Sequence, residues 1–162
     1  MRQHVPARHV RRELLPEQSP ALLQELHLLT RAGDLNADAR RKLKQINHLC
    51  TQIGPLLEHA FEQPEPLVVD AGAGNAYLGF ILYELWFRER GALISVERRA
   101  DLVERGRERA RQLGFERMQF AQAAVAEFEP PAKVDLVVAL HACDTATDDA
   151  LALAIRGQVP AV

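Results

Sequence analysis

The sequence lacks most of the features that mark specialised protein classes. Its two cysteines, Cys50 and Cys143, are too few for a disulfide framework, which is typical of a reducing compartment. No apolar run approaches the roughly 20 residues of a membrane span, and the N-terminus lacks the apolar core of a secretory signal. Internal repeats, low-complexity segments and metal-ligand sets are also missing. We therefore expect a cytoplasmic globular protein with no membrane contact and no metal site.

The composition is enough for one hydrophobic core of moderate size, since 48% of the 162 residues are hydrophobic and 26% are charged. Charge is uneven, because residues 1–60 carry a net charge of +3 and residues 61–162 a net charge of −5. The proline-rich segment Glu62–Pro66 lies at the join. The sequence therefore predicts an N-terminal helical region over residues 1–61 and an α/β domain over residues 62–162.

Two helices are expected in the N-terminal region. Ser19-Pro20 is typical of an N-cap and a first helical residue, and Gly33 is typical of a helix end. The second helix is expected from about Asn36 to Ile53, before Gly54-Pro55.

The second of these helices has two distinct faces. One face is basic, with Arg41, Lys44 and His48, and fits either a solvated surface or contacts with the phosphate backbone of RNA. No aromatic residues lie among these charges, so base stacking receives no support. The other face is apolar and is expected to be buried. It consists of Leu43, Ile46, Cys50 and Ile53.

Strands and helices alternate after residue 66, which predicts a parallel sheet with helices on both faces. In such sheets a ligand binds beyond the carboxyl ends of the strands. The expected strands are 67–70, 93–97, 118–123 and 134–140, and the expected helices end near Arg90, span 100–113 and begin near Thr145.

The most informative segment joins the first strand to its helix, where residues 68–79 read VVDAGAGNAYLG. An apolar run ends in the carboxylate of Asp70, and two glycines then turn the chain into an amphipathic helix with open backbone N–H groups. A second carboxylate, Glu97, closes the next strand. This arrangement predicts a nucleoside site at the carboxyl ends of the strands, where Gln122 and His141 also fall.

The charge of this segment decides between nucleosides. A dinucleotide fingerprint needs a third glycine where Tyr77 stands, and the carboxylate of Asp70 would repel a pyrophosphate. S-adenosylmethionine suits the site better, because it carries an ammonium, a sulfonium and a ribose diol but no phosphate. Asp70 would offset its positive end, and Glu97 would accept both ribose hydroxyls. Gly72 and Gly74 would let the cofactor approach the backbone, although an ordinary strand-to-helix turn also explains two glycines.

Together with the segment ALHACDTATD at residues 139–148, these motifs resemble the class I S-adenosylmethionine-dependent methyltransferases, whose fold is Rossmann-like. The leucine-histidine-alanine-cysteine motif after strand four is similar to one subgroup. That subgroup includes bacterial methyltransferase-domain proteins, C-terminal domains of glutathione-transferase-like proteins and, distantly, a tRNA ribose methyltransferase. Residues 42–47, KLKQIN, resemble the helix that precedes the bacterial domain. The resemblance covers about residues 40–156.

The resemblance implies a cofactor-binding role for Asp70, Gly72, Gly74, Asn75, Glu97 and Gln122. The chain departs from the class pattern at two points. Ala76 stands where the class usually has a third glycine, and it is tolerable there if the backbone is already helical. Alanines follow Gln122 where a polar residue is expected to meet the adenine amine, so Gln122 or a backbone group would take that place.

His141 is the candidate for catalysis. Methyl transfer needs an aligned nucleophile, and histidine titrates near neutral pH and can remove a proton from an oxygen or nitrogen acceptor. The alternative is that His141 only orders its loop or packs under the cofactor. Cys143 is interpreted as a buried small residue, because no basic neighbour in the sequence favours its thiolate. Thr145 and Asp148 are typical of a helix cap.

Three functions remain open. The leading one is an S-adenosylmethionine-dependent methyltransferase, with RNA weakly favoured as acceptor by the family likeness and the basic helix face. The second is a cofactor-binding module without methyl transfer, because the adenine-side polar residue is missing and the chain ends early. The third is an NAD-dependent oxidoreductase, which Tyr77 and Asp70 disfavour.

The last expectation concerns the fourth strand. Class I methyltransferases usually have seven strands, with the fifth beside the fourth, and only four are readable here. The resemblance implies the order three, two, one, four for these strands. The apolar run Leu136–Leu140 would then form an exposed edge without the charges or proline that protect natural edges. We therefore expect a fold truncated after strand four and its helix, with weak catalysis. Self-association through this edge, or a covering partner, is expected as well.

Overall fold

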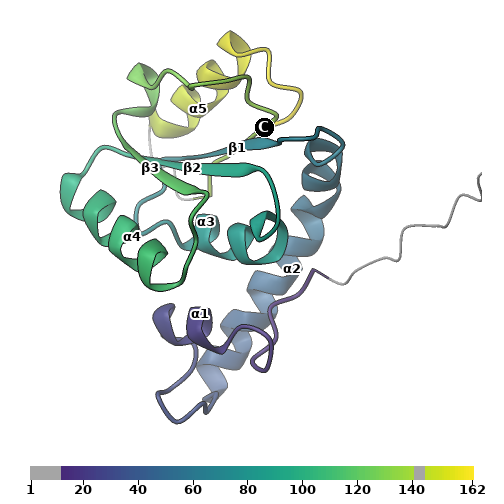
Figure 1. Cartoon of the computed structure of the whole chain (residues 1–162), viewed down its shortest axis with the longest axis vertical. Helices are drawn as coiled ribbons and strands as arrows, with labels where there is room; N and C mark the ends of the chain where they lie inside the picture. Colours follow the sequence, from purple (N-terminus) through teal and green to yellow (C-terminus); the bar gives the residue numbers. More distant parts are fainter. Residues whose placement is uncertain (1–11, 141–144) are drawn as a thin grey trace, which may run out of the picture.

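A four-stranded parallel sheet forms the centre of the fold (Figure 1). The computed structural model describes residues 12–140 and 145–162. The strands are β1 (Leu67–Ala71), β2 (Ala92–Glu97), β3 (Met118–Gln122) and β4 (Leu136–Val138). They lie in the order β3-β2-β1-β4, all parallel. The predicted α/β class and strand order are therefore confirmed.

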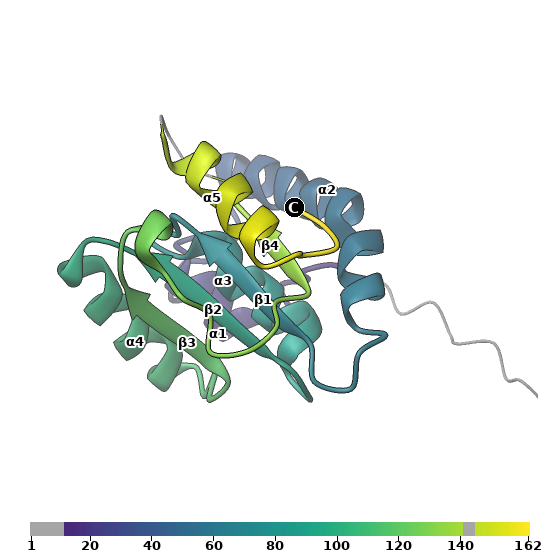
Figure 2. The same cartoon turned by 90° about the horizontal axis from the view of Figure 1, so that it is seen from above.

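Helices cover both faces of the sheet. They are α1 (Pro20–Glu25), α2 (Ala37–Ala60), α3 (Tyr77–Leu82), the π-helical turn η1 (Tyr83–Phe87), α4 (Ala100–Gln112), the short 3-10 helix η2 (Val125–Glu127) and α5 (Thr145–Arg156). Helices α1 to α4 lie on one face, and α5 and η2 lie on the other (Figures 1 and 2). Side chains of β1 alternate between the two resulting clusters, as Val68 and Val69 show. Within the described residues, no helix has the length and apolarity needed to cross a membrane.

The N-terminal helices share one core with the sheet. Leu22 of α1 and Leu57 of α2 are buried in the same cluster as Val68 and Phe80. The two regions expected from the sequence are therefore in contact through a common hydrophobic core. The apolar face predicted for α2 is confirmed by the burial of Leu43, Ile46 and Cys50.

Helix α1 is shorter than predicted. It ends at Glu25 and not near Gly33. His27 has a left-handed φ of 56°, which turns the chain away from the helix axis. Leu28, which follows, is 3% exposed, so burial of this side chain compensates for the early end of the helix.

The N-cap of α1 also differs from the prediction. Ser19 holds the N-cap position, but its hydroxyl makes no bond to the helix and donates to Oε1 of Glu84 at 2.7 Å. The other oxygen of Glu84 accepts from Nε of Arg88 at 2.8 Å. The cap position therefore ties α1 to η1, which lies 65 residues away along the chain.

Helix α2 continues through Gly54-Pro55, so the end predicted at Ile53 is wrong. Pro55 has no backbone N–H to donate to the preceding turn, which removes one helical hydrogen bond. The apolar face nevertheless continues to the fully buried Leu57. A Cβ at Gly54 would lie 4.0 Å from Cζ2 of Trp86, so the glycine leaves room for the ring. Tertiary packing therefore overrides the local break.

Strand β4 spans Leu136–Val138, a shorter segment than the predicted 134–140. Just before it, the Asp135 N–H donates to the Leu67 carbonyl, and the Leu67 N–H donates to Oδ2 of Asp135, both at 2.9 Å. At this end of the strand, a side-chain carboxylate therefore accepts one of the two hydrogen bonds between β4 and β1. At the other end Leu140 is 42% exposed, whereas the three strand residues are buried as predicted.

The outer edge of β4 is engaged at one residue. The Val137 N–H donates to the Ala161 carbonyl at 3.2 Å, so the segment after α5 lies against the strand there. The expectation of a bare edge is wrong at this point, because a backbone acceptor from the same chain occupies it. Self-association through the edge stays a prediction.

Replacing Pro55 by alanine is expected to raise the free energy of unfolding by about 1–3 kcal/mol, because alanine restores a helical bond at an exposed position. Urea denaturation followed by circular dichroism measures this change. Pro131 is exposed and lies outside the helices and strands. Pro131→Ala is the control and should lose about 0.4–1 kcal/mol, because the unfolded chain gains freedom. A similar loss in Pro55→Ala would contradict a continuous α2.

Candidate functional site

Three left-handed residues turn the chain from β1 into α3. Gly72, Gly74 and Ala76 have φ values of 67°, 56° and 54°, a region that glycine enters without steric cost. The Ala73 N–H donates to the Val96 carbonyl at 2.9 Å, and the Ala76 N–H donates to the Ala73 carbonyl at 2.7 Å. The first of these bonds fastens the turn to β2. We refer to residues 72–76 as the glycine turn.

Ala76 departs from the backbone expected for it. A helical conformation was predicted to make alanine tolerable there, but Ala76 is the left-handed N-cap of α3. An L residue in this region costs about 1–2 kcal/mol relative to glycine. Burial of the side chain and the bond to Ala73 offset that cost. The turn therefore keeps the conformation of a third glycine although an alanine occupies the position.

Glu97 lies at the end of β2 and is hydrogen-bonded to the glycine turn. Its Oε2 accepts from the Gly74 N–H at 2.9 Å, and its Oε1 accepts from the Arg99 N–H at 2.9 Å. The side chain is half-buried. Because each carboxylate oxygen can accept two hydrogen bonds, both keep capacity for ribose hydroxyls. Gln122, which is exposed, pairs in register with Glu97 at the same edge of the sheet.

Asp70 lies behind the glycine turn, with an exposed fraction of 2%. Its carboxylate accepts from the Gly79 backbone N–H and, at 3.5 Å, from the Ser95 hydroxyl. Burial raises the pKa of Asp70 from 3.8 to about 7, and these two bonds oppose the rise. A Cβ at Gly79 would lie 3.0 Å from Oδ2 of Asp70, so the close approach requires glycine. Asp70 thus supports the turn from inside the core, and its effect on a cationic ligand stays a prediction.

A cavity of about 590 Å³ opens beside the glycine turn, and we call it the turn cavity. Its walls come from the turn, from α2 and from the segment after α1. Lys42 and Gln45 of α2 line it, yet neither is among the predicted site residues. The likeness of residues 42–47 to the helix before the bacterial domain is the sequence signal that points to them. Helix α2 is therefore part of the site as well as of the core.

A smaller cavity of about 190 Å³ adjoins the turn cavity. The two cavities share Gln45, Ile46 and Tyr77 as lining residues. The rest of the smaller cavity is lined by apolar side chains from α2, α3 and the end of β4, namely Leu49, Leu78, Ile81 and Leu140. It offers an apolar space next to the candidate cofactor site, and we call it the apolar cavity.

The structure brings most of the predicted binding residues together and leaves the catalytic one undescribed. Asn75 is exposed and lines the turn cavity, and its carbonyl accepts from Nη1 of Arg109 at 3.5 Å. His141 and Cys143 lie outside the described residues, so their roles stay predictions. Leu140, which precedes them, reaches the apolar cavity.

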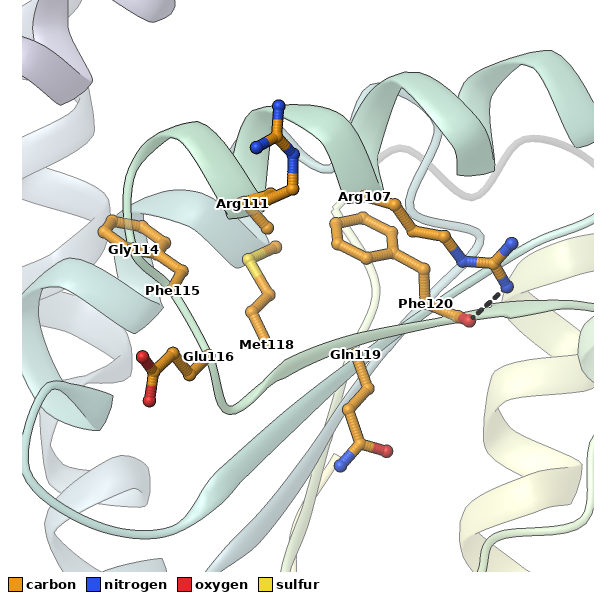
Figure 3. Close-up of a pocket in the computed structure, with 9 residues that line it drawn as sticks. Arg107, Arg111, Gly114, Phe115, Glu116, Met118, Gln119 and Phe120 are labelled. Atoms are coloured by element: carbon orange, nitrogen blue, oxygen red, sulfur yellow. Dashed lines mark hydrogen bonds between the residues drawn. The ribbon is translucent and has the colours of Figure 1, made fainter.

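A separate cavity of about 630 Å³ lies between α4 and β3 (Figure 3). Arg107 of α4 points across it, and its Nη2 donates to the Phe120 carbonyl at 3.1 Å. Met118, the first residue of β3, also lines it. Ligands of parallel sheets bind beyond the carboxyl ends of the strands, so the candidate site is the one at the glycine turn.

Comparison with known proteins gives a family match over most of the chain. A family model described as a methyltransferase domain matches residues 41–162. The match begins inside α2 and includes the whole sheet and the glycine turn. A comparison with curated proteins finds no match.

Solved structures share the fold at low sequence identity. Precorrin-6y C5,15-methyltransferase from Geobacter metallireducens is 16% identical with a TM-score of 0.51, over 64% of this chain and 54% of that chain. The cyclase SpnF is also 16% identical, with a TM-score of 0.53, over 68% of this chain and 41% of that chain. The chain thus spans about half the length of these proteins. The likeness confirms the Rossmann-like fold.

Replacing Asp70 by asparagine should change the pH dependence of stability. Between pH 4 and pH 7 the folded state holds a proton that the unfolded state releases, so the free energy of unfolding falls as pH rises through this window. An asparagine amide does not titrate, so the stability of Asp70→Asn relative to the wild type should rise by up to roughly 4 kcal/mol between pH 4 and pH 8.

Urea denaturation at pH 4, 6 and 8 measures this difference. Asp34→Asn is the matched control, because it makes the same substitution at an exposed carboxylate. A pH-independent difference for Asp70→Asn would contradict a protonated, buried Asp70.

Proposed function

We propose that this chain transfers a methyl group from S-adenosylmethionine to an acceptor bound at the apolar cavity. The chain belongs to the methyltransferase-domain family, and its cofactor is S-adenosylmethionine. One observation carries the proposal. The half-buried carboxylate of Glu97 is hydrogen-bonded to the Gly74 N–H, at the wall of a cavity of about 590 Å³. A ribose acceptor is therefore hydrogen-bonded to the backbone turn that lines this cavity.

The residues of the turn fit this cofactor. A Cβ at Gly74 would meet no atom within 4 Å, so open space faces the backbone there. Gly74 brings the main chain to the cavity without a side chain, and Glu97 supplies acceptors for a diol. No phosphate needs to be accommodated beside the carboxylates of Asp70 and Glu97. When bound, the cofactor supplies an activated methyl group on its sulfonium.

The remaining chemistry belongs to residues around the acceptor. The apolar cavity places mostly apolar side chains beside Tyr77, which offers a surface for an apolar part of the acceptor. Burial raises the pKa of the Tyr77 phenol above its ordinary value, so it stays neutral and can donate a hydrogen bond. His141 is retained as the proposed general base, because it follows Leu140 of the apolar cavity directly in the sequence.

RNA is the acceptor that the charge of α2 supports. Arg41, Lys44 and His48 are all exposed on the helix that also lines both cavities. Arg41 is partly neutralised by its ion pair with Asp38. Lys44 remains to meet a phosphate backbone, and His48 lies one turn further along the same face. The apolar cavity offers space for a group of that acceptor next to the methyl donor.

Isothermal titration calorimetry with S-adenosylmethionine and with NAD tests the cofactor. Saturable binding of S-adenosylmethionine alone supports the proposal, and binding of NAD alone contradicts it. Incubation with labelled S-adenosylmethionine and total RNA then tests transfer. Label in RNA supports an RNA acceptor, and label confined to protein in a cell extract contradicts it. Cofactor binding without label in RNA or in protein would favour a binding module without methyl transfer. The alanines after Gln122, where a polar residue is expected to meet the adenine amine, also favour that alternative.

Replacing Gly74 by alanine should weaken S-adenosylmethionine binding about tenfold or more, because the added methyl enters the space that faces the cofactor. Gly114→Ala is a matched control. Gly114 has a φ of 68°, a Cβ there would also meet no atom within 4 Å, and the residue follows α4 away from the turn. Both variants should lose about 1–2 kcal/mol of stability from backbone strain. Equal affinity losses in the two variants would contradict the proposed site.

A further inference from the structure

We infer that Lys42 of α2 binds the carboxylate at the methionine end of the cofactor and so fixes the direction in which the cofactor lies. The inference rests on the proposed function and deepens it. It assigns Lys42 to the recognition of the cofactor's carboxylate. Lys42 belongs neither to the glycine motif nor to the end of a strand.

Lys42 is placed for this role by the fold of α2. It lines the turn cavity together with Ala73 and Gly74, although the helix and the turn are about 30 residues apart in sequence. Its neighbour Arg41 is paired with Asp38, four positions before Lys42. In residues 12–140 and 145–162, no carboxylate forms an ion pair with Lys42. Its ammonium group is therefore available to a ligand.

The charge of the cavity selects the group that binds there. The other lining residues are apolar side chains, Gly74, the amides Gln45 and Asn75, and the neutral phenol of Tyr77. Among the described residues of the wall, Lys42 is thus the only charged one. S-adenosylmethionine carries two cationic groups and a single anionic one, its carboxylate. Coulomb attraction favours the carboxylate at Lys42 and disfavours the sulfonium and the ammonium there.

Two anchors at opposite ends of the cofactor give it a direction. Glu97 bonds the Gly74 N–H and offers acceptors for the ribose, while Lys42 lies on α2 across the turn cavity. The sulfonium, which connects the ribose to the methionine chain, would then lie between Glu97 and Lys42. Gln45 and Tyr77 border this space and also line the apolar cavity. The orientation therefore presents the methyl group toward the proposed acceptor space.

A ligand that lacks only the carboxylate gives a direct test. Decarboxylated S-adenosylmethionine keeps the sulfonium, the ribose and the amine. In isothermal titration of the full chain, Lys42→Ala should weaken binding of S-adenosylmethionine about tenfold or more. The same variant should change affinity for the decarboxylated ligand less than about twofold. Lys133→Ala, which removes an exposed lysine outside the cavity wall, should change neither affinity. Circular dichroism checks that both variants fold.

The outcomes separate the inference from the proposed function. Unchanged S-adenosylmethionine affinity in Lys42→Ala overturns the inference alone, as does an equal loss for both ligands. Wild-type protein that binds neither ligand overturns the proposed function, and the inference falls with it. Loss of discrimination between the two ligands, seen only in Lys42→Ala, supports the carboxylate contact.

Discussion

The left-handed turn between β1 and α3 is the constraint on which the rest of the site depends. Three alternate residues of this turn have a left-handed φ, which residues with a side chain disfavour. Hydrogen bonds from the Ala73 N–H to the Val96 carbonyl and from the Gly74 N–H to Glu97 hold the turn against β2. Asp70 supports it from within the core through the Gly79 N–H and the Ser95 hydroxyl. Because β1 lies between β2 and β4, a turn fixed in this way presents its open side at the centre of the carboxyl edge.

Helix α2 has two roles that depend on each other. Its apolar face enters the same core as the sheet, through residues such as Leu43 and Leu57. That packing brings Lys42 and Gln45 to the glycine turn, where they become the wall of the turn cavity. Removal of the helix would therefore open the core and dismantle the cofactor site together. The family match, which begins at residue 41, includes the part of α2 that lines the cavities.

Local patterns were sufficient to predict the strands, and the family resemblance supplied their order. Apolar runs marked the mostly buried β1, β2 and β4, and the VVDAGAGNAYLG segment marked the turn with the correct glycines. Contacts distant in sequence decided what the patterns missed. Gly54-Pro55 reads as a helix end, but packing of Leu57 and Trp86 carries α2 past it. The likeness of residues 42–47 to the helix before the bacterial domain points to Lys42, but only the docking of α2 shows that this exposed lysine lines the turn cavity. Ala76 could not be placed, since its left-handed φ depends on the bonds around it.

Titration of isotopically labelled protein with S-adenosylmethionine, followed by amide NMR, tests the central claim most directly. The account predicts that the Gly74 amide, which now donates to Glu97, shifts with saturation. The Gly114 amide, which donates to the Arg111 carbonyl beside the cavity between α4 and β3, should stay unchanged. A saturable shift at Gly114 with none at Gly74 would contradict the account, because it would place the ligand away from the glycine turn.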